Sequence, residues 1–240
     1  MHNLTMIVDG HTGIEHTLPV EMIYGDVLDL WRGVGVGYTP TLSVAYGGLG
    51  GENYWYEIDD LWRHQRVSTF LPPQKVIPRA RRRSKAPIED YNHIRQARIA
   101  KKLVDLGEGV QAGGHGQLNG LCTHWELWSF VQGGMSPMDA LRCATVHGAA
   151  YLGMENDLGT IEEGKLADMI IFQPGKNPTI EIRDSEYIEY VVANGRLYEA
   201  TSMTELGNHP GKRQPFYWES NPLGARVMMS DPAGCAGCRQ

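Results

Sequence analysis

Short hydrophobic runs and longer amphipathic stretches follow one another in a regular order along the first two thirds of the chain. A run of four to eight apolar residues indicates a buried strand, and apolar positions that recur every three or four residues indicate a helix. The sequence predicts strands at residues 13–18, 38–45 and 109–112, and helices at residues 20–32, 89–106, 123–132 and 137–152. Residues 3–9 are compatible with a helix end or with a strand. Repeating strand–helix units of this kind predict an α/β fold with a parallel sheet.

The pattern changes after Gly153, where short strands and turns replace the helices. Residues 169–172 and 187–193 predict two strands, and Asn194-Gly195 is a strong hairpin signal that leads into a return strand. These changes divide the chain into an α/β unit, a small β unit and a loop-like tail, at residues 1–154, 155–206 and 207–240.

A long connection at residues 46–88 separates the second predicted strand from the next long helix. Connections of this length are usually functional or disordered. The glycines and the aromatic cluster at residues 54–56 favour an ordered loop that covers a site. The basic run at residues 79–85 resembles a nucleic-acid-binding tract, but on an acidic chain we interpret it as a solvated or salt-bridged surface.

The composition is that of an ordinary soluble globular protein, with 42% hydrophobic and 21% charged residues among 240. The net charge of −6 argues against a general nucleic-acid binder. No apolar run approaches the roughly 20 residues of a membrane span, and we recognise no signal peptide, so the compartment stays undecided. Cys122 and Cys143 are interpreted as small apolar or reactive positions, whereas Cys235 and Cys238 form a single CxxC, a weak zinc or redox signal in a tail-like segment.

Candidate chemistry is concentrated in residues 113–127, which contain four glycines, His115, His124 and Glu126 between an apolar run and a helix. A glycine-rich turn from strand to helix lets the backbone approach a ligand closely. The carboxyl ends of parallel strands are where α/β folds place their chemistry. The alternative is a tight turn whose histidines form structural hydrogen bonds only.

Several segments together resemble the metal-dependent amidohydrolase superfamily, and in particular its imidazolonepropionase-type members. The resemblance is carried by Gly-Ile-Glu-His at 13–16, the stretch 113–127, the helix at 135–145, Leu-Gly-Thr-Ile-Glu-Glu-Gly-Lys-Leu-Ala-Asp at 158–168 and the hairpin at 192–196. It implies the C-terminal part of a (β/α)8 TIM barrel, about three βα units, followed by part of a small β-sandwich. It also implies a divalent metal, usually Zn²⁺, that activates water for attack on a C–N bond.

The resemblance places His16 among the metal ligands, although a core histidine bonded to backbone is the alternative. His115 stands where many relatives have an aspartate. It is therefore the candidate catalytic residue, with an open choice between metal ligand and proton shuttle. His124 is expected to contact substrate or to orient its neighbours. Tyr46 and Glu52 are expected to line a substrate-binding loop at the barrel mouth.

The predicted function is hydrolysis of a cyclic amide or peptide-like C–N bond in a small-molecule or peptide-like substrate. No His-x-His motif occurs in the chain, and no strands precede the unit that contains His16. We therefore expect an incomplete fragment whose partner is the missing N-terminal half of the barrel. The alternative is a non-catalytic fragment or pseudoenzyme that serves assembly. A homo-oligomer remains open, and neither nucleic acid nor a membrane is an expected partner.

Overall fold

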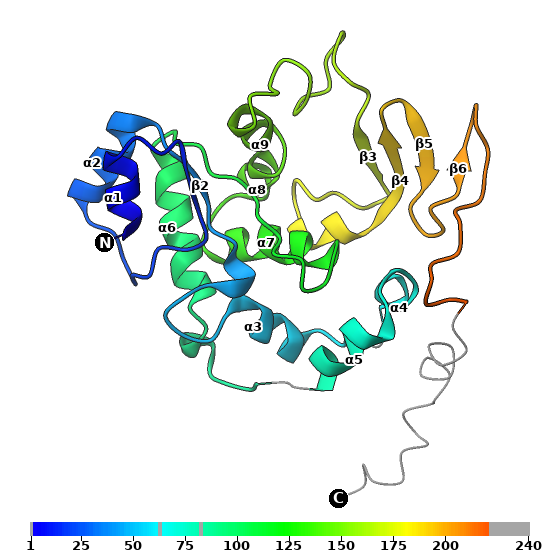
Figure 1. The fold of residues 1–240 in the computed structure, drawn as a ribbon, viewed down its shortest axis with the longest axis horizontal. Coiled ribbons are helices and arrows are strands. Elements are labelled where there is room, and N and C mark those ends of the chain that lie inside the picture. Colours follow the sequence, from blue (N-terminus) through cyan, green and yellow to red (C-terminus); the bar gives the residue numbers. More distant parts are fainter. Residues whose placement is uncertain (1, 62–63, 82–83, 221–240) are drawn as a thin grey trace, which may run out of the picture.

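The computed structural model describes residues 2–61, 64–81 and 84–220. Figure 1 shows helices around short parallel strands, and a four-stranded antiparallel sheet at one side. The helical region contains α1 (His2–Val8), β1 (Gly13–Glu15), α2 (Gly25–Val34), β2 (Gly37–Thr39), η1 (Leu42–Val44), α3 (Gly51–Ile58), α4 (Gln65–Phe70), α5 (Pro73–Arg81), η3 (Ile88–Asp90), α6 (His93–Asp105), α7 (Leu121–Gln132), α8 (Pro137–Cys143) and α9 (Val146–Tyr151). The second region contains β3 (Met169–Phe172), η4 (Ile182–Glu186), β4 (Ile188–Ala193), β5 (Arg196–Glu199) and β6 (Glu205–Leu206).

Three parallel segments form the centre of the helical region. β1 and β2 pair in parallel with Ile14 opposite Tyr38, and Val110 forms a parallel bridge with Tyr38 on its other side. The Tyr38 N–H donates to the Gly109 carbonyl, and the Gln111 N–H donates to the Tyr38 carbonyl, both at 2.9 Å. This third segment, predicted as a strand, is reduced to a single bridge because it pairs with one neighbour around one residue. The α/β class is confirmed, whereas the barrel portion and the β-sandwich stay predictions.

β1 and β2 are also shorter than predicted. β1 ends at Glu15 because His16 adopts a left-handed backbone, with φ +68°. β2 ends at Thr39 because Pro40 has no N–H to donate to a ladder and Thr41 is left-handed, with φ +51°. The rest of the predicted second strand forms η1 instead. Each strand is therefore followed closely by a left-handed residue, His16 after β1 and Thr41 after β2, which places these residues at the end of the sheet.

The connection after β2 is largely helical, which corrects the prediction of a loop. α3 carries the aromatic cluster, and its Trp55 is 1% exposed and stacks on Trp125 of α7, with ring centroids 6.3 Å apart. The Trp55 indole N–H also donates to Ser129 Oγ at 3.2 Å. Since buried aromatic area dominates core energetics, packing on α7 stabilises a helix that the glycine-rich sequence does not reveal. Arg82 and Arg83 of the basic run lie outside the described residues.

The helix predicted at 137–152 is divided into α8 and α9. The break lies at Thr145, whose hydroxyl donates to the Leu141 carbonyl at 2.8 Å and competes with regular helix geometry. The predicted N-cap of α8 is confirmed, because Ser136 Oγ accepts from the Asp139 N–H at 3.1 Å.

The antiparallel sheet has the order β3-β4-β5-β6. Asn194 and Gly195 join β4 to β5 with φ values of +48° and +77°, as a two-residue type I′ turn requires, so the predicted hairpin is confirmed. β6 lies in a segment that the sequence pattern did not predict as a strand, and its Glu205 forms an ion pair with Arg196 of β5. The tail with Cys235 and Cys238 lies outside the described residues.

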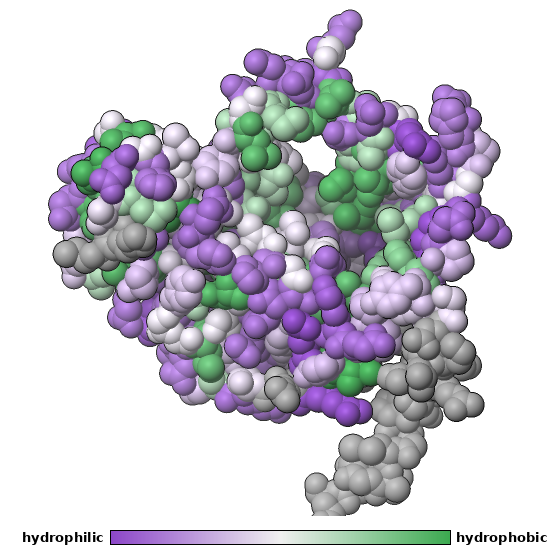
Figure 2. Space-filling model, in the orientation of Figure 1, coloured by the Kyte–Doolittle hydropathy of each residue, from purple (hydrophilic) through white to green (hydrophobic). Residues whose placement is uncertain are grey.

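Strand β3 leaves apolar surface uncovered. It occupies one edge of the sheet, and Ile170 and Ile171 on its two faces are 53% and 43% exposed. Figure 2 shows hydrophobic side chains around the hollow between helices α8–α9 and β3. Among the described residues, none of the helices has the length and apolar character needed to cross a membrane.

Candidate functional site

His16 and His115 meet at the end of the parallel strands. His16 follows β1 directly, and its N–H donates to the Thr39 carbonyl at 2.8 Å. Its ring centroid lies 5.3 Å from that of His115 and 6.2 Å from that of Tyr46. His16 Nδ1 is buried without a hydrogen-bond partner, whereas His115 is exposed and its Nδ1 lies 3.0 Å from Gln117 Oε1. The structure thus brings together two imidazoles that are 99 positions apart in the sequence.

Backbone strain marks the same place. His16 and Thr41 both have positive φ, and for a β-branched threonine this conformation is a genuine outlier. Such residues persist only where the surrounding structure holds them, and they cluster at active sites and ligand clamps. Gly114 permits a further close approach, because a Cβ there would lie 2.9 Å from the Thr123 backbone nitrogen at the start of α7.

Glu126 lies beneath these strand ends and connects them. It is fully buried on α7, and its Oε2 accepts from the Leu42 N–H at 2.7 Å. Burial raises the pKa of this carboxyl to about 8, although the backbone N–H groups of Leu42, Gly113, Thr41 and Ser43 oppose the rise. Glu126 Oε1 accepts no hydrogen bond of good geometry. The sequence placed Glu126 in the motif at 113–127 but gave it no role.

Glu52 reaches the site from α3. Its carboxylate accepts from the Tyr56 hydroxyl at 3.2 Å. Burial raises the pKa of Glu52, and the nearby charges of Arg79 and His115 partly oppose that rise. Tyr46 is 52% exposed beside His16. Glu52 and Tyr46 are therefore in the same neighbourhood as the histidine pair, and their substrate-binding role stays a prediction.

The described residues do not by themselves complete a metal centre. Catalytic zinc usually has three protein ligands drawn from histidine, cysteine and carboxylates. No group of three or more such residues is arranged to hold an ion within residues 2–61, 64–81 and 84–220. His16 Nδ1 is a buried donor atom without a partner, and it lies beside the ring of His115. The pair fits part of a ligand set but not all of it.

Cys122 and Cys143 are both free and buried. Burial raises the pKa of each thiol, that of Cys143 to about 12, so neither is a reactive thiolate near neutral pH. Of the two alternatives open for these cysteines, the small apolar one fits the described structure.

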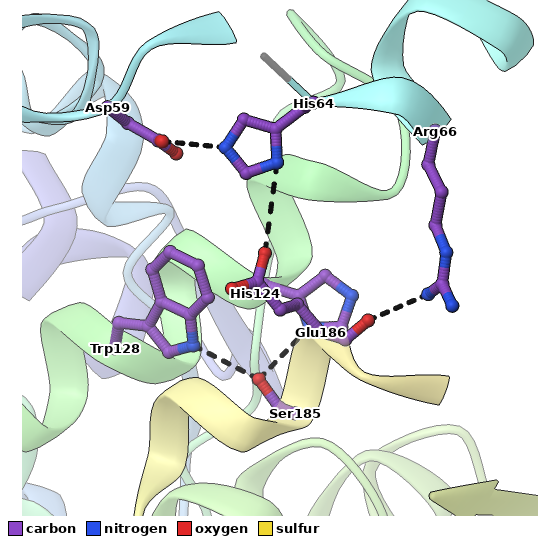
Figure 3. Close-up of polar contacts among 7 residues, drawn as sticks. All are labelled: Asp59, His64, Arg66, His124, Trp128, Ser185 and Glu186. Atoms are coloured by element: carbon purple, nitrogen blue, oxygen red, sulfur yellow. Dashed lines mark hydrogen bonds and ion pairs between the residues drawn. The ribbon is translucent and has the colours of Figure 1, made fainter. Parts of the chain in front are cut away.

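His124 does not join the histidine pair by any contact in the described structure; it lines a separate cavity. That cavity has a volume of about 520 Å³ and lies between the start of α7, helix α4 and the sheet strands β4 and β5. As Figure 3 shows, His124 Nδ1 lies 3.1 Å from Ser185 Oγ, which also accepts from the Trp128 indole N–H at 3.0 Å. Burial, then the charge of Arg66, lowers the pKa of His124 to about 4, so its ring is neutral.

An ionic cluster beside this cavity joins α4 to η4. His64 Nε2 lies 2.6 Å from Asp59 Oδ1, and His64 Nδ1 lies 3.9 Å from Glu186 Oε2. Arg66 donates to the Glu186 carbonyl at 2.7 Å (Figure 3) and to the Ile188 carbonyl at 2.6 Å. The hydrogen bond with Asp59 is the largest of the effects that raise the pKa of His64. Sequence reasoning missed this cluster because Glu186 and Ile188 lie 120 and 122 positions after Arg66, and no spacing motif connects the two segments.

Comparison with known proteins agrees with this architecture. A model of the amidohydrolase family matches residues 115–198. The probable imidazolonepropionase of Homo sapiens is 32% identical over 108 residues, which make up 42% of this chain and 25% of that protein. The imidazolonepropionase of Symbiobacterium thermophilum is 50% identical over 38 residues, 16% of this chain and 9% of that protein.

Solved structures give the same result over a longer range. A Xaa-Pro dipeptidase with methionine bound in its active site has a TM-score of 0.54 and 26% identity, over 81% of this chain and 41% of the dipeptidase. The ochratoxinase of A. niger has a TM-score of 0.52 and 22% identity, over 82% of this chain and 39% of that enzyme, and supports the fold alone. The chain therefore spans a quarter or less of the two curated relatives and about two fifths of these structures.

The fold and the strand-end site define an α/β protein with its candidate chemistry at the carboxyl ends of parallel strands. The family match over residues 115–198, the imidazolonepropionase relatives and the dipeptidase structure point more narrowly in one direction: they support a relationship of the chain to the amidohydrolase superfamily.

Proposed function

We propose that this chain contributes the strand-end site of a metal-dependent hydrolase that cleaves a cyclic amide or peptide-like C–N bond. The observation that carries the proposal is His16 Nδ1, a buried nitrogen without a partner that lies beside His115 at the end of β1. A buried polar atom normally has a hydrogen-bond partner. In this proposal a bound ligand is the missing partner of His16 Nδ1.

Enzymes of this superfamily typically use a divalent metal, which lowers the pKa of water and polarises the bond to be cleaved. In the proposal His16 is a ligand, and His115 either completes the same set or carries a proton. His115 suits proton transfer because it is exposed and its Nδ1 is held by Gln117, which orients the ring. Tyr46 and Glu52 contact the substrate from the connection after β2.

The proposal requires further ligands and further strands from outside the described residues. β1 pairs only with β2 in the described structure, and β3 leaves apolar side chains exposed on both faces. We infer that a partner polypeptide segment covers these edges and supplies the remaining ligands. The same exposed edges favour a second candidate, a non-catalytic assembly role in which the fold is kept without a metal.

Zinc binding by the 240-residue chain tests the site directly. Calorimetric titration with Zn²⁺ is expected to show one weak site in the wild type and none in His16→Ala. Loss of binding in His115→Ala as well would make His115 a ligand, and retained binding would make it the proton carrier. His209→Ala, which removes an exposed histidine elsewhere, is the matched control and keeps wild-type binding. Zinc binding that survives in His16→Ala would contradict the assignment.

Hydrolysis distinguishes the two candidates. The chain is assayed with Zn²⁺, with and without a polypeptide that carries the upstream half of a relative, on an imidazolone ring and on Xaa-Pro dipeptides. The hydrolase proposal expects turnover in the complemented sample and its loss in His16→Ala. Stable association without turnover would favour the assembly role.

A further inference from the structure

The cavity beside His124 is separate from the strand-end site and has no role in the proposed reaction. Its walls are mainly apolar, with contributions from Phe70 of α4, Leu121 of α7 and Tyr198 of β5 among others. Ligand sites in proteins are typically cavities of about 300–1,000 Å³ that combine apolar walls with a few polar groups. A volume of about 520 Å³ is within that range.

The hydrogen bonds of Ser185 determine which ring nitrogen of His124 carries the proton and faces the cavity. Ser185 is 3% exposed, and its hydroxyl has one hydrogen to donate. Its oxygen accepts from the Trp128 indole, and His124 Nδ1 is the one acceptor that the described residues offer to its hydrogen, so the hydroxyl donates to Nδ1. Nδ1 of the neutral ring is therefore the acceptor, and Nε2 carries the proton. His124 then faces a ligand as a neutral N–H donor.

The charges that line the cavity balance one another. His64 and Arg66 are the cations, and Glu186 and Glu199 are the acids. Two of the five N–H donors of Arg66 bind backbone carbonyls, and the Glu199 carboxylate accepts from Ser202 Oγ. His64 lies between Glu186 and Asp59, which stands behind it. With His64 protonated, the two cations and the two acids cancel in number, so a ligand with a net charge gains no net attraction here, and it would lose its hydration on entry.

From this geometry we propose that the cavity binds an uncharged molecule with an apolar body and one carbonyl-type acceptor, held by the Nε2–H of His124. The apolar walls bury the body, and the Nε2–H of His124 fixes the orientation of the acceptor. The site needs no metal, so its success or failure is independent of the proposed hydrolase activity.

Three probes with nearly the same shape test the chemistry. They are 4-phenylbutan-2-one, the isosteric anion 3-phenylpropanoate and the cation of 4-phenylbutan-2-amine. Each is titrated into the metal-free 240-residue chain by calorimetry, with saturation-transfer NMR as a second readout. The ketone is expected to bind with a Kd of about 1 mM or tighter, and each charged analogue about tenfold more weakly.

Variants locate the binding. His124→Leu keeps the bulk but removes the donor, and it is expected to weaken ketone binding about fivefold. His124→Gln supplies an amide N–H and should recover part of that loss, which a purely structural defect would not do. Val191→Trp fills the cavity and should abolish binding, whereas the exposed control His209→Leu should leave it unchanged. Circular dichroism checks that each variant is folded.

Equal binding of all three probes, or ketone binding that survives in Val191→Trp, would overturn the proposal. So would the absence of saturable binding of the ketone to the folded wild type. Tighter binding of the anion or the cation than of the ketone would show that the charges of the cavity are not balanced, and it would equally refute the assignment.

Discussion

Glu126 gives the sharpest test of how the strand-end site is held together. The carboxyl is fully buried on α7, and burial raises its pKa from 4.5 to about 8. In the unfolded chain it titrates near its ordinary value. The folded protein therefore binds this proton more tightly than the unfolded chain does. The contribution to stability is fully present below about pH 4.5, and it is lost progressively as the pH rises through the folded-state pKa.

The size of the effect follows from the difference between the two pKa values. One pKa unit is worth about 1.4 kcal/mol, so the full effect is about 5 kcal/mol. Between about pH 5 and about pH 8 we expect the stability of the wild type relative to Glu126→Gln to fall by about 3 to 4 kcal/mol. Glutamine has nearly the same shape and does not titrate. Taking the difference between the two proteins removes the contributions of other groups, including that of His124.

The assay is urea unfolding followed by tryptophan fluorescence, with linear extrapolation at each pH. Glu163→Gln, an exposed substitution of the same chemistry, is the control and should show no pH-dependent difference. Glu126→Leu leaves the buried Leu42 N–H without its acceptor and should cost about 1–3 kcal/mol at every pH. A wild-type minus Glu126→Gln difference that stays constant within about 1 kcal/mol from pH 5 to pH 8 would refute the reasoning.

Four further outcomes follow, three from the packing and one from a raised pKa. Gly133→Ala should destabilise by about 1–3 kcal/mol in urea unfolding, since its Cβ would lie 2.6 Å from the Ala97 backbone carbon. Gly33→Ala, in open space on α2, should stabilise by about 0.5–1 kcal/mol. Ser136→Ala should cost about 1 kcal/mol through loss of the α8 cap, measured in the same way. The raised pKa of His64 adds stability that is fully present below its ordinary pKa of 6.5 and is lost as the pH rises through the folded value. The destabilisation caused by His64→Gln should therefore shrink as the pH rises above about 6.5. A His64→Gln effect that grows with pH would have the wrong sign.

Much of the candidate site could be predicted from local sequence. The glycine-rich stretch 113–127 identified a strand-to-helix turn, and the segment 13–16 placed His16 after a strand. Ser136 and Asn194-Gly195 were predicted correctly because a helix cap and a two-residue hairpin turn depend on a few neighbouring residues. The class of fold followed from the order of apolar runs, and the family followed from several short motifs together.

Other features depend on residues that are distant in the sequence, and only the tertiary structure decided them. The helix α3 forms because Trp55 packs on Trp125. The ends of β1 and β2 are fixed by Glu126 and by left-handed residues, and the surrounding packing offsets the conformational strain of those residues. His124 belonged by spacing to the same motif as His115, yet its ring lies against Ser185, 61 residues away. The sequence by itself determined the residue types, the local turns and the resemblance to the superfamily. The tertiary structure decided which side chains share a cavity, because burial and charge act between atoms that only folding brings together.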